Sequence, residues 1–260
     1  MASDIFDLRA KVALITGSTK GIGRAIAEEL ARHGARVVIS SRKADACEAV
    51  AAAINAELAD APGEAVAIPA HIGERAELER LVAETRRRLG PVDVLVCNAA
   101  VNPYFGPSKD IPDSAFDKIM NVNIRSNHWL AHLVLPEMVE RKSGSIMVVS
   151  SVGGLRGSTD LGAYAISKAA DLQLVRNLAC EYGQYNIRVN AISPGLIRTD
   201  FARALWENPD NLERRTARDP LRRIGEPEEI AGAAVFLASR AGAFTTGQNF
   251  VIDGGATIAG

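Results

Sequence analysis

The sequence predicts an α/β protein whose core is a doubly wound parallel sheet of about seven strands with helices on both faces. Three observations predict this fold. Short runs of β-branched apolar residues alternate with Ala-rich segments of helical period along the chain. The runs are apolar almost throughout, which is typical of strands covered on both faces. A glycine-rich turn joins the first run to the first helical segment.

The elements follow in a regular order. Strands are expected at residues 12–16, 36–41, 65–69, 92–97, 145–150, 187–192 and 249–252, and helices at 22–33, 44–58, 74–89, 114–141, 165–182 and 227–237. Pro136 should kink or end the helix at 114–141, because proline has no backbone N–H. Pro227 suits the first turn of a helix. Residues 199–226 are the least regular stretch and are expected to form a lid or binding loop.

Length, net charge and cysteine spacing narrow the classes of protein to which this chain could belong. The chain has 260 residues, a formal net charge of −1 and three widely spaced cysteines. This balance gives no electrostatic reason to expect nucleic acid or an anionic membrane as a partner, and the cysteines form no metal or disulfide pattern. No signal peptide or long apolar run is apparent, and the final residues, Ile258 to Gly260, do not match a peroxisomal signal. We therefore expect one domain over residues 1–260, no bound metal and a cytoplasmic location.

The glycine-rich turn predicts a dinucleotide site of Rossmann type. Its glycines follow a G-x-x-x-G-x-G order, and such a turn brings backbone N–H groups and a helix N-terminus onto a pyrophosphate. An ordinary glycine-rich turn between a strand and a helix is the alternative interpretation. The expected contacts are Gly17, Ser18, Thr19, Lys20, Gly21, Ile22 and Gly23.

The end of the second strand favours NADP(H) over NAD(H). An acidic side chain usually holds the adenosine ribose hydroxyls at this point, but the chain has Ser41, Arg42 and Lys43. A guanidinium suits a 2′-phosphate, and Lys20 could reach the same group. The alternative is that Arg42 and Lys43 merely solvate the start of a helix.

Tyr164 and Lys168 are four residues apart and predict an acid/base pair on one helix face. A free tyrosine has a pKa near 10, so a proton relay near neutral pH requires a drop of about 3 units, roughly 4 kcal/mol. A neighbouring lysine cation and the positive nicotinamide can supply that stabilisation. Ser151 lies just beyond a strand, where its hydroxyl could donate to a substrate carbonyl oxygen. Without Ser151 and the glycine turn, a Tyr-Lys pair would indicate only a surface helix.

Over residues 8–256 the chain resembles the short-chain dehydrogenase/reductase family. The matching motifs are TGSTKGIG, CNAA, MNVN, VVSS, YAISK and SPGLIRT, in the order of that family. The resemblance implies that Asn123 completes a catalytic tetrad with Ser151, Tyr164 and Lys168. It also implies that Asn123 bends its helix and holds a water that relays protons to Lys168. Lys168 would in addition hold the nicotinamide ribose.

The resemblance implies further cofactor contacts. Asn98 would support the sheet near the adenosine ribose, with Ala99 and Ala100 beside it, and the loop after the sixth strand would bind the nicotinamide through Pro194, Gly195, Ile197 and Thr199. His71 and Ile72 replace the Asp-Val pair usual beside the adenine, so the carboxylate contact to the adenine amino group is lost.

A narrower resemblance, to NADPH-dependent carbonyl/retinal reductases, implies reduction of ketones and aldehydes. Segments expected at the carboxyl ends of the strands supply an apolar substrate pocket, made of Tyr104, Phe105, Leu155, Phe201, Leu205 and Trp206. Some of these side chains could instead pack against each other or another subunit. A 3-oxoacyl reductase acting on acyl carrier protein or acyl-CoA thioesters is the alternative enzyme, and a non-catalytic cofactor-sensing protein is a remote one. Family resemblance also implies that the helices at 114–141 and 165–182 pair between subunits in a homotetramer.

Overall fold

Seven parallel strands form one sheet in the computed structural model of the chain, which describes residues 4–58 and 61–259. Residues 1–3 and 260, the ends of the domain predicted over 1–260, lie outside this description, as do residues 59–60. The strand order is β3-β2-β1-β4-β5-β6-β7, which confirms the predicted doubly wound, Rossmann-type sheet. The strands are β1 (Val12–Thr16), β2 (Arg36–Ser40), β3 (Glu64–Ala67), β4 (Val94–Cys97), β5 (Gly144–Val149), β6 (Ile187–Pro194) and β7 (Asn249–Ile252).

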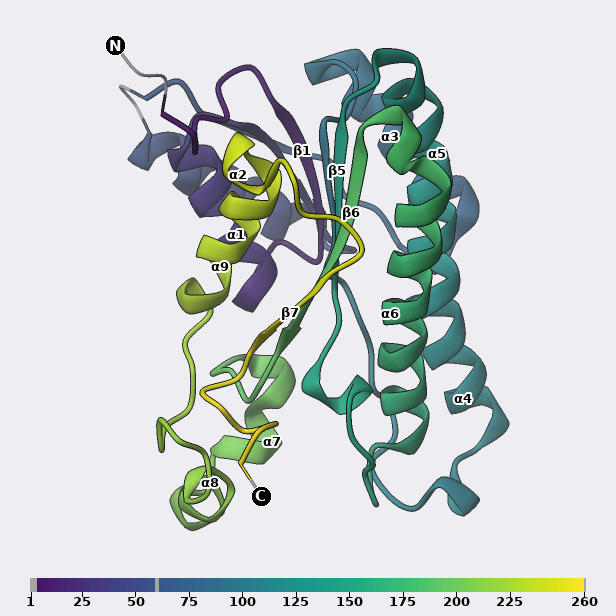
Figure 1. Ribbon diagram of the computed structural model, residues 1–260, viewed down its shortest axis with the longest axis vertical. Coiled ribbons are helices and arrows are strands. Elements are labelled where there is room, and N and C mark those ends of the chain that lie inside the picture. Colours follow the sequence, from purple (N-terminus) through teal and green to yellow (C-terminus); the bar gives the residue numbers. More distant parts are fainter. Residues whose placement is uncertain (1–3, 59–60, 260) are drawn as a thin grey trace.

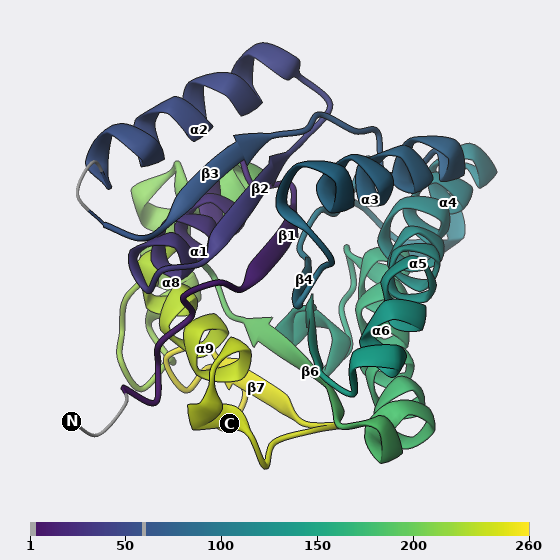
Figure 2. The same ribbon diagram turned by 90° about the horizontal axis from the view of Figure 1, so that it is seen from above.

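Helices cover both faces of this sheet, as Figures 1 and 2 show. Helices α1, α2 and α9 pack on one face, and α3, α5 and α6 pack on the other. The helices are α1 (Gly21–Arg32), α2 (Ala44–Glu57), α3 (Arg75–Leu89), α4 (Asp113–Met120), α5 (Ser126–Arg141), α6 (Gly162–Tyr182), α7 (Arg203–Trp206), α8 (Pro209–Thr216) and α9 (Glu228–Ala238).

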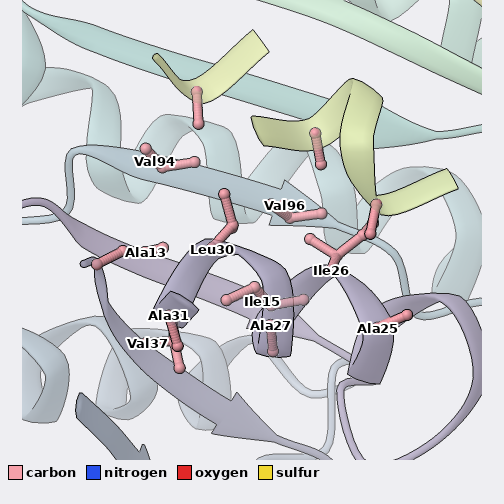
Figure 3. Packing of buried hydrophobic residues seen from close by; sticks show 14 of the residues in the cluster. Ala13, Ile15, Ala25, Ile26, Ala27, Leu30, Ala31, Val37, Val94 and Val96 are labelled. Atoms are coloured by element: carbon pink, nitrogen blue, oxygen red, sulfur yellow. The ribbon is translucent and has the colours of Figure 1, made fainter. Parts of the chain in front are cut away.

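Side chains alternate in direction along β1, which explains why the core has one apolar layer on each face of the sheet. Ile15 points to the layer that contains Ile26 and Leu30 of α1, and Figure 3 shows these side chains lying together. Leu14 points to the opposite layer and is fully buried there. Because side chains alternate along a strand, an apolar run buries both of its faces only when both are covered.

The predicted helix at 114–141 is interrupted, but not at Pro136. A π turn over Asn121–Arg125 separates α4 from α5, and α5 then continues through Pro136 to Arg141. Pro136 was predicted to kink or end the helix, and the helix does not end there. Pro136 lies on the exposed side of α5, and because it has no backbone N–H it cannot donate to the carbonyl of His132.

The stretch over residues 199–226 is more regular than the sequence suggested. It contains the short helices α7 and α8, and Pro209 opens α8 in its first turn. Figure 1 shows both helices beyond the carboxyl ends of the strands. In a doubly wound sheet, ligands bind at this edge, where the strand order reverses between β1 and β4.

Candidate active site

The glycine-rich turn runs from β1 into α1 at the carboxyl edge of the sheet. Gly17 has φ of +65°, a conformation that side chains disfavour. Ser18 is buried and is held by the structure itself, since its hydroxyl donates to the Ile15 carbonyl (2.8 Å) and accepts from the Ser40 amide (2.8 Å). Thr19 and Ile22 are partly exposed on the same turn. Among the described residues, no side chain caps the first turn of α1, so the amides of this turn are available to bind an anion.

Gly23 lies where α1 passes closest to the end of β4. A Cβ at this position would lie closer to the Asn98 side chain and the Gly17 carbonyl than real Cβ atoms do. Asn98 Nδ2 donates to the carbonyls of Thr16 (2.9 Å) and Gly17 (3.2 Å), which ties β4 to the turn. This close packing of α1 on the end of β4 holds the turn in place, and the amides of such a turn suit the pyrophosphate of a dinucleotide.

The segments after β2 and β3 lie next to each other, where the adenosine end of such a cofactor would bind. Arg42 and Lys43 are exposed, and among the described residues the Arg42 guanidinium has no ion-pair partner. Ser41 Oγ lies 3.3 Å from Cys47 Sγ, so its hydroxyl is partly engaged in the turn. His71 is exposed and accepts from the Gly73 amide through Nδ1 (3.2 Å), and Ile72 is half-buried behind it.

Tyr164 and Ser151 meet beside Gly153. Ser151 follows β5, and its hydroxyl accepts from the Gly153 amide at 3.0 Å. A Cβ at Gly153 would lie 3.4 Å from Ser151 Oγ and 3.9 Å from the Tyr164 ring, so both side chains border one small space. Helix α6 begins at Gly162, three residues earlier than predicted, which places Tyr164 inside its first turn. A hydroxyl and a phenol that border one space suit a carbonyl oxygen that gains charge.

Lys168 lies one turn below Tyr164 and is almost fully buried. Its Nζ is 5.8 Å from the centroid of the Tyr164 ring and donates to the carbonyl of Val149 at 2.9 Å. The Asp171 carboxylate lies 3.1 Å from the same nitrogen. Burial alone would lower the pKa of Lys168, but Asp171 and Tyr164 outweigh it and raise that pKa. A positive charge therefore persists directly beneath the phenol.

Asn123 sits in the π turn, fully buried against the segment after β4. Its side chain accepts from the Val101 amide (2.9 Å) and donates to the Val101 carbonyl (3.1 Å) and to Ser167 Oγ (3.0 Å). Its main-chain carbonyl accepts from Asn127 Nδ2 at 2.6 Å. The helix is wound as a π turn at this point. The main-chain carbonyl of Asn123 is therefore bonded by a side-chain amide from the next turn of the helix.

The loop after β6 reaches back to the glycine-rich turn. Gly195 packs so tightly on Asp253 that a Cβ would collide with its backbone, and Ile197 is buried. The methyl group of Thr199 lies against Gly21. Pro194 ends β6, so the four residues predicted to hold the nicotinamide follow one another along this loop, and Ala99, after β4, lies against Gly17.

An ion-pair bridge connects the turn to the predicted lid. Lys20 Nζ lies 3.4 Å from the Asp200 carboxylate, which also pairs with Arg203 at 2.7 Å. Arg203 and Lys20 lower the pKa of Asp200. The structure thus directs Lys20 toward the lid, whereas the sequence suggested contact with a 2′-phosphate.

The predicted substrate residues divide into two groups. The Phe201 ring lies 6.0 Å from the Tyr164 ring, and Tyr104 and Tyr164 line one tight crevice. Phe105 and Leu155 are exposed. Leu205 is half-buried on α7, and Trp206 donates through Nε1 to the Thr199 carbonyl, so the Trp206 indole N–H is bonded within the lid.

Three polar residues of the site were not predicted. Asn102 lines the crevice beside Tyr164, and its Oδ1 is buried without a partner among the described residues. Asp171 and Asn127 are buried beneath Lys168. Their spacing was a usable signal, because each interrupts an apolar helical stripe, three residues after Lys168 and four after Asn123.

A metal-binding cluster and a membrane-spanning helix are both absent from the described residues. Within residues 4–58 and 61–259, His, Cys, Asp and Glu side chains form no group of three that could hold a metal ion. None of the helices in this part of the chain combines the length and apolarity needed to cross a bilayer.

Comparison with known proteins gives close matches over the whole fold. A family model described as enoyl-(acyl carrier protein) reductase matches residues 17–257. Bovine dehydrogenase/reductase SDR family member 4 is 44% identical over 245 residues, which cover 94% of this chain and 86% of that protein. A gluconate 5-dehydrogenase from Burkholderia cenocepacia, solved with NADP and tartrate, has a TM-score of 0.94, 31% identity and full coverage of both chains. A 7α-hydroxysteroid dehydrogenase solved with NADH has a TM-score of 0.90 and 37% identity, covering 98% of this chain and 97% of that one.

Proposed function

The chain belongs to the short-chain dehydrogenase/reductase family and is an oxidoreductase of that family, and we propose that it is an NADP(H)-dependent carbonyl reductase. It would interconvert a carbonyl compound and a secondary alcohol, with Tyr164 as the general acid/base. The observation that carries this proposal is the placement of Tyr164 above the buried, charged Lys168 and across Gly153 from Ser151. All seven strands in the described part of the chain share one sheet, which fits a protein that works as a single domain.

The residues divide the chemistry between them. When bound, the nicotinamide supplies or accepts the hydride. In reduction, Tyr164 gives its proton to the carbonyl oxygen, while the Ser151 hydroxyl donates a hydrogen bond to the same atom. In the reverse direction, Tyr164 takes the proton from the alcohol. Lys168 stabilises the phenolate electrostatically, and Asn123 fixes the turn on which this part of the site rests.

NADP(H) is the preferred cofactor in this proposal, with NAD(H) as the weaker candidate. Arg42 and Lys43 are exposed beside the place where the adenosine would lie, and the end of β2 carries no acid to repel a 2′-phosphate. Relatives differ on this point, since one similar structure was solved with NADP and another with NADH. The choice for this chain therefore rests on Ser41, Arg42 and Lys43.

The substrate is proposed to be a small, largely apolar ketone or aldehyde. Phe201 and Tyr104 border Tyr164, and residues 199–226 would close over the bound compound as a lid. The matching family model, described as enoyl-(acyl carrier protein) reductase, favours a second candidate, a reductase of acyl carrier protein or acyl-CoA thioesters. The three free cysteines are consistent with a cytoplasmic location.

The test follows the absorbance of reduced nicotinamide while the protein oxidises NADPH or NADH in the presence of ketones, aldehydes and acetoacetyl thioesters. We expect NADPH oxidation by simple ketones or aldehydes and a loss of at least about 10³-fold in Tyr164→Phe, whose ring cannot transfer the proton. Tyr182→Phe, the same change later on α6, should retain the rate.

Other outcomes would revise the proposal. Turnover with thioesters alone would favour the acyl reductase, and faster turnover with NADH would contradict the assignment of Arg42. Equal activity of Tyr164→Phe and the parent protein would rule out Tyr164 as the acid/base.

A further inference from the structure

A carboxylate is buried directly beneath the site. Asp171 lies on α6, three residues after Lys168, and is fully buried. One of its oxygens is 3.1 Å from Lys168 Nζ. An ammonium group has three N–H donors, and Asp171 and the Val149 carbonyl occupy two of them. One donor is left for the space under Tyr164.

Asn127 fixes the other oxygen of this carboxylate. Its Nδ2 donates to Asp171 Oδ1 at 3.0 Å and to the Asn123 carbonyl at 2.6 Å, and the Asn127 side chain is buried. The amide thereby joins α5, the π turn and α6 by direct hydrogen bonds. Both amide hydrogens and both carboxylate oxygens are used, as a buried polar network requires.

Charge explains why a carboxylate belongs there. A lysine buried without a counter-ion loses its proton readily, because burial disfavours the charged form. The titratable groups facing Lys168 are Asp171 and Tyr164 on its own helix and Cys97 at the end of β4. Burial raises the pKa of Cys97, so this thiol stays neutral and cannot serve as the counter-ion. Burial also raises the pKa of Asp171, and Lys168 and Asn127 offset part of that rise. The neighbours from β5 and α5, the Val149 carbonyl and Asn127, are neutral.

We propose that Asp171, held by Asn127, is a positioning residue that keeps Lys168 charged and directed at Tyr164. The inference rests on the proposed function only for its consequence in turnover. The charge and direction of Lys168 are properties of the protein alone. Asp171 touches neither substrate nor cofactor in this scheme and acts through Lys168.

The test measures the charge of Lys168 in the full-length protein without cofactor. Lysine labelled at Cε gives a resonance whose chemical shift changes when the ammonium loses its proton, and Lys168→Arg identifies the signal. In the parent protein, we expect Lys168 to stay charged from about pH 6 to pH 9. Asp171→Asn keeps the shape of the side chain but removes its charge. In this variant Lys168 should lose its proton inside that range, because its pKa is expected to fall by about 2 units or more.

Three further variants make the result specific. Asn127→Ala leaves the carboxylate but removes its amide donor, so a smaller shift in the same direction is expected, and this variant also serves if Asp171→Asn fails to fold. Asp171→Glu should restore the parent titration at least in part. Glu181→Gln removes a carboxylate from the exposed side of the same helix and should leave Lys168 unchanged.

The pH profile of turnover separates this inference from the proposed function. If Lys168 loses its charge in Asp171→Asn and the rising limb of the pH profile for alcohol oxidation moves to higher pH, the inference and the proposed function are both supported. If Lys168 loses its charge but the profile does not move, Asp171 is confirmed as the counter-ion and the proposed role of Lys168 in catalysis is contradicted. If Lys168 stays charged in Asp171→Asn throughout the range, the inference is overturned, whatever the activity.

Discussion

Gly23 illustrates how a single missing side chain shapes the cofactor site. The residue lies in the first turn of α1, buried against Asn98 and the Gly17 carbonyl. Any Cβ there would push α1 away from the end of β4. Because Asn98 holds the turn through two hydrogen bonds, the displacement would pass to the backbone amides that face the pyrophosphate.

Gly23→Ala is therefore expected to weaken both folding and cofactor binding. Overpacking should lower the free energy of unfolding by roughly 1–3 kcal/mol. NADPH affinity, measured by calorimetry, should fall by about tenfold or more, equivalent to about 1.4 kcal/mol.

Gly232→Ala is the matched control. This glycine lies in α9, where an added Cβ would meet nothing within 4 Å. Alanine should leave NADPH affinity unchanged and raise stability by up to about 1 kcal/mol. Unaltered NADPH binding in Gly23→Ala would contradict the assignment of the turn as the cofactor cradle.

At the scale of elements, α5 contains a proline that its neighbours tolerate. Pro136 leaves the His132 carbonyl without its helical partner, yet the helix continues for five more residues to Arg141. Burial of Leu130, Val134 and Met138 against the sheet holds the helix in place. Tertiary packing here outweighs the local preference of proline, as it commonly does in proteins.

Pro136→Ala is expected to stabilise the protein. An interior proline costs about 3 kcal/mol relative to alanine, and about 1 kcal/mol of this is offset because proline also restricts the unfolded chain. A net gain of roughly 1–2 kcal/mol should appear as a higher denaturation midpoint. Pro209→Ala, at the first turn of α8 where proline is favourable, should give no gain. Equal effects of the two substitutions would show that helix position does not decide the outcome.

Much of this architecture could be predicted from the sequence, for identifiable reasons. Buried apolar runs such as Val12–Thr16 locate strands, and the spacing of Tyr164, Lys168 and Ser151 predicts the candidate site. The π turn could not be located from periodicity, since one extra residue leaves no compositional mark. Asp171 was missed because its role depends on Asn127, which the fold brings to it from another helix.

At the scale of the whole molecule, the sheet has an open edge. β7 is the outer strand, pairs with β6 alone in the described sheet, and leaves Val251 40% exposed. Phe244, just before this strand, is fully exposed. Exposed apolar side chains beside an unpaired strand are typical of a surface that another chain covers.

Family resemblance implies a homotetramer, and the assembly can be measured directly. Light scattering should give a mass about four times the 27.7 kDa of one chain, and dilution should not reduce it at micromolar concentration. A mass equal to one chain would exclude the assembly and would leave the β7 edge exposed to solvent.

The π turn changes the direction in which the side chains of α5 point. Each residue of an α-helix advances the direction of the side chain by about 100°, and a π turn adds one residue to the winding. The faces of α5 are therefore rotated by about that angle from those that a uniform continuation of α4 would present. Asn127 reaches Asp171 only in this rotated phase. A chain shortened by one residue within Asn121–Arg125 would separate these two side chains even if both were retained.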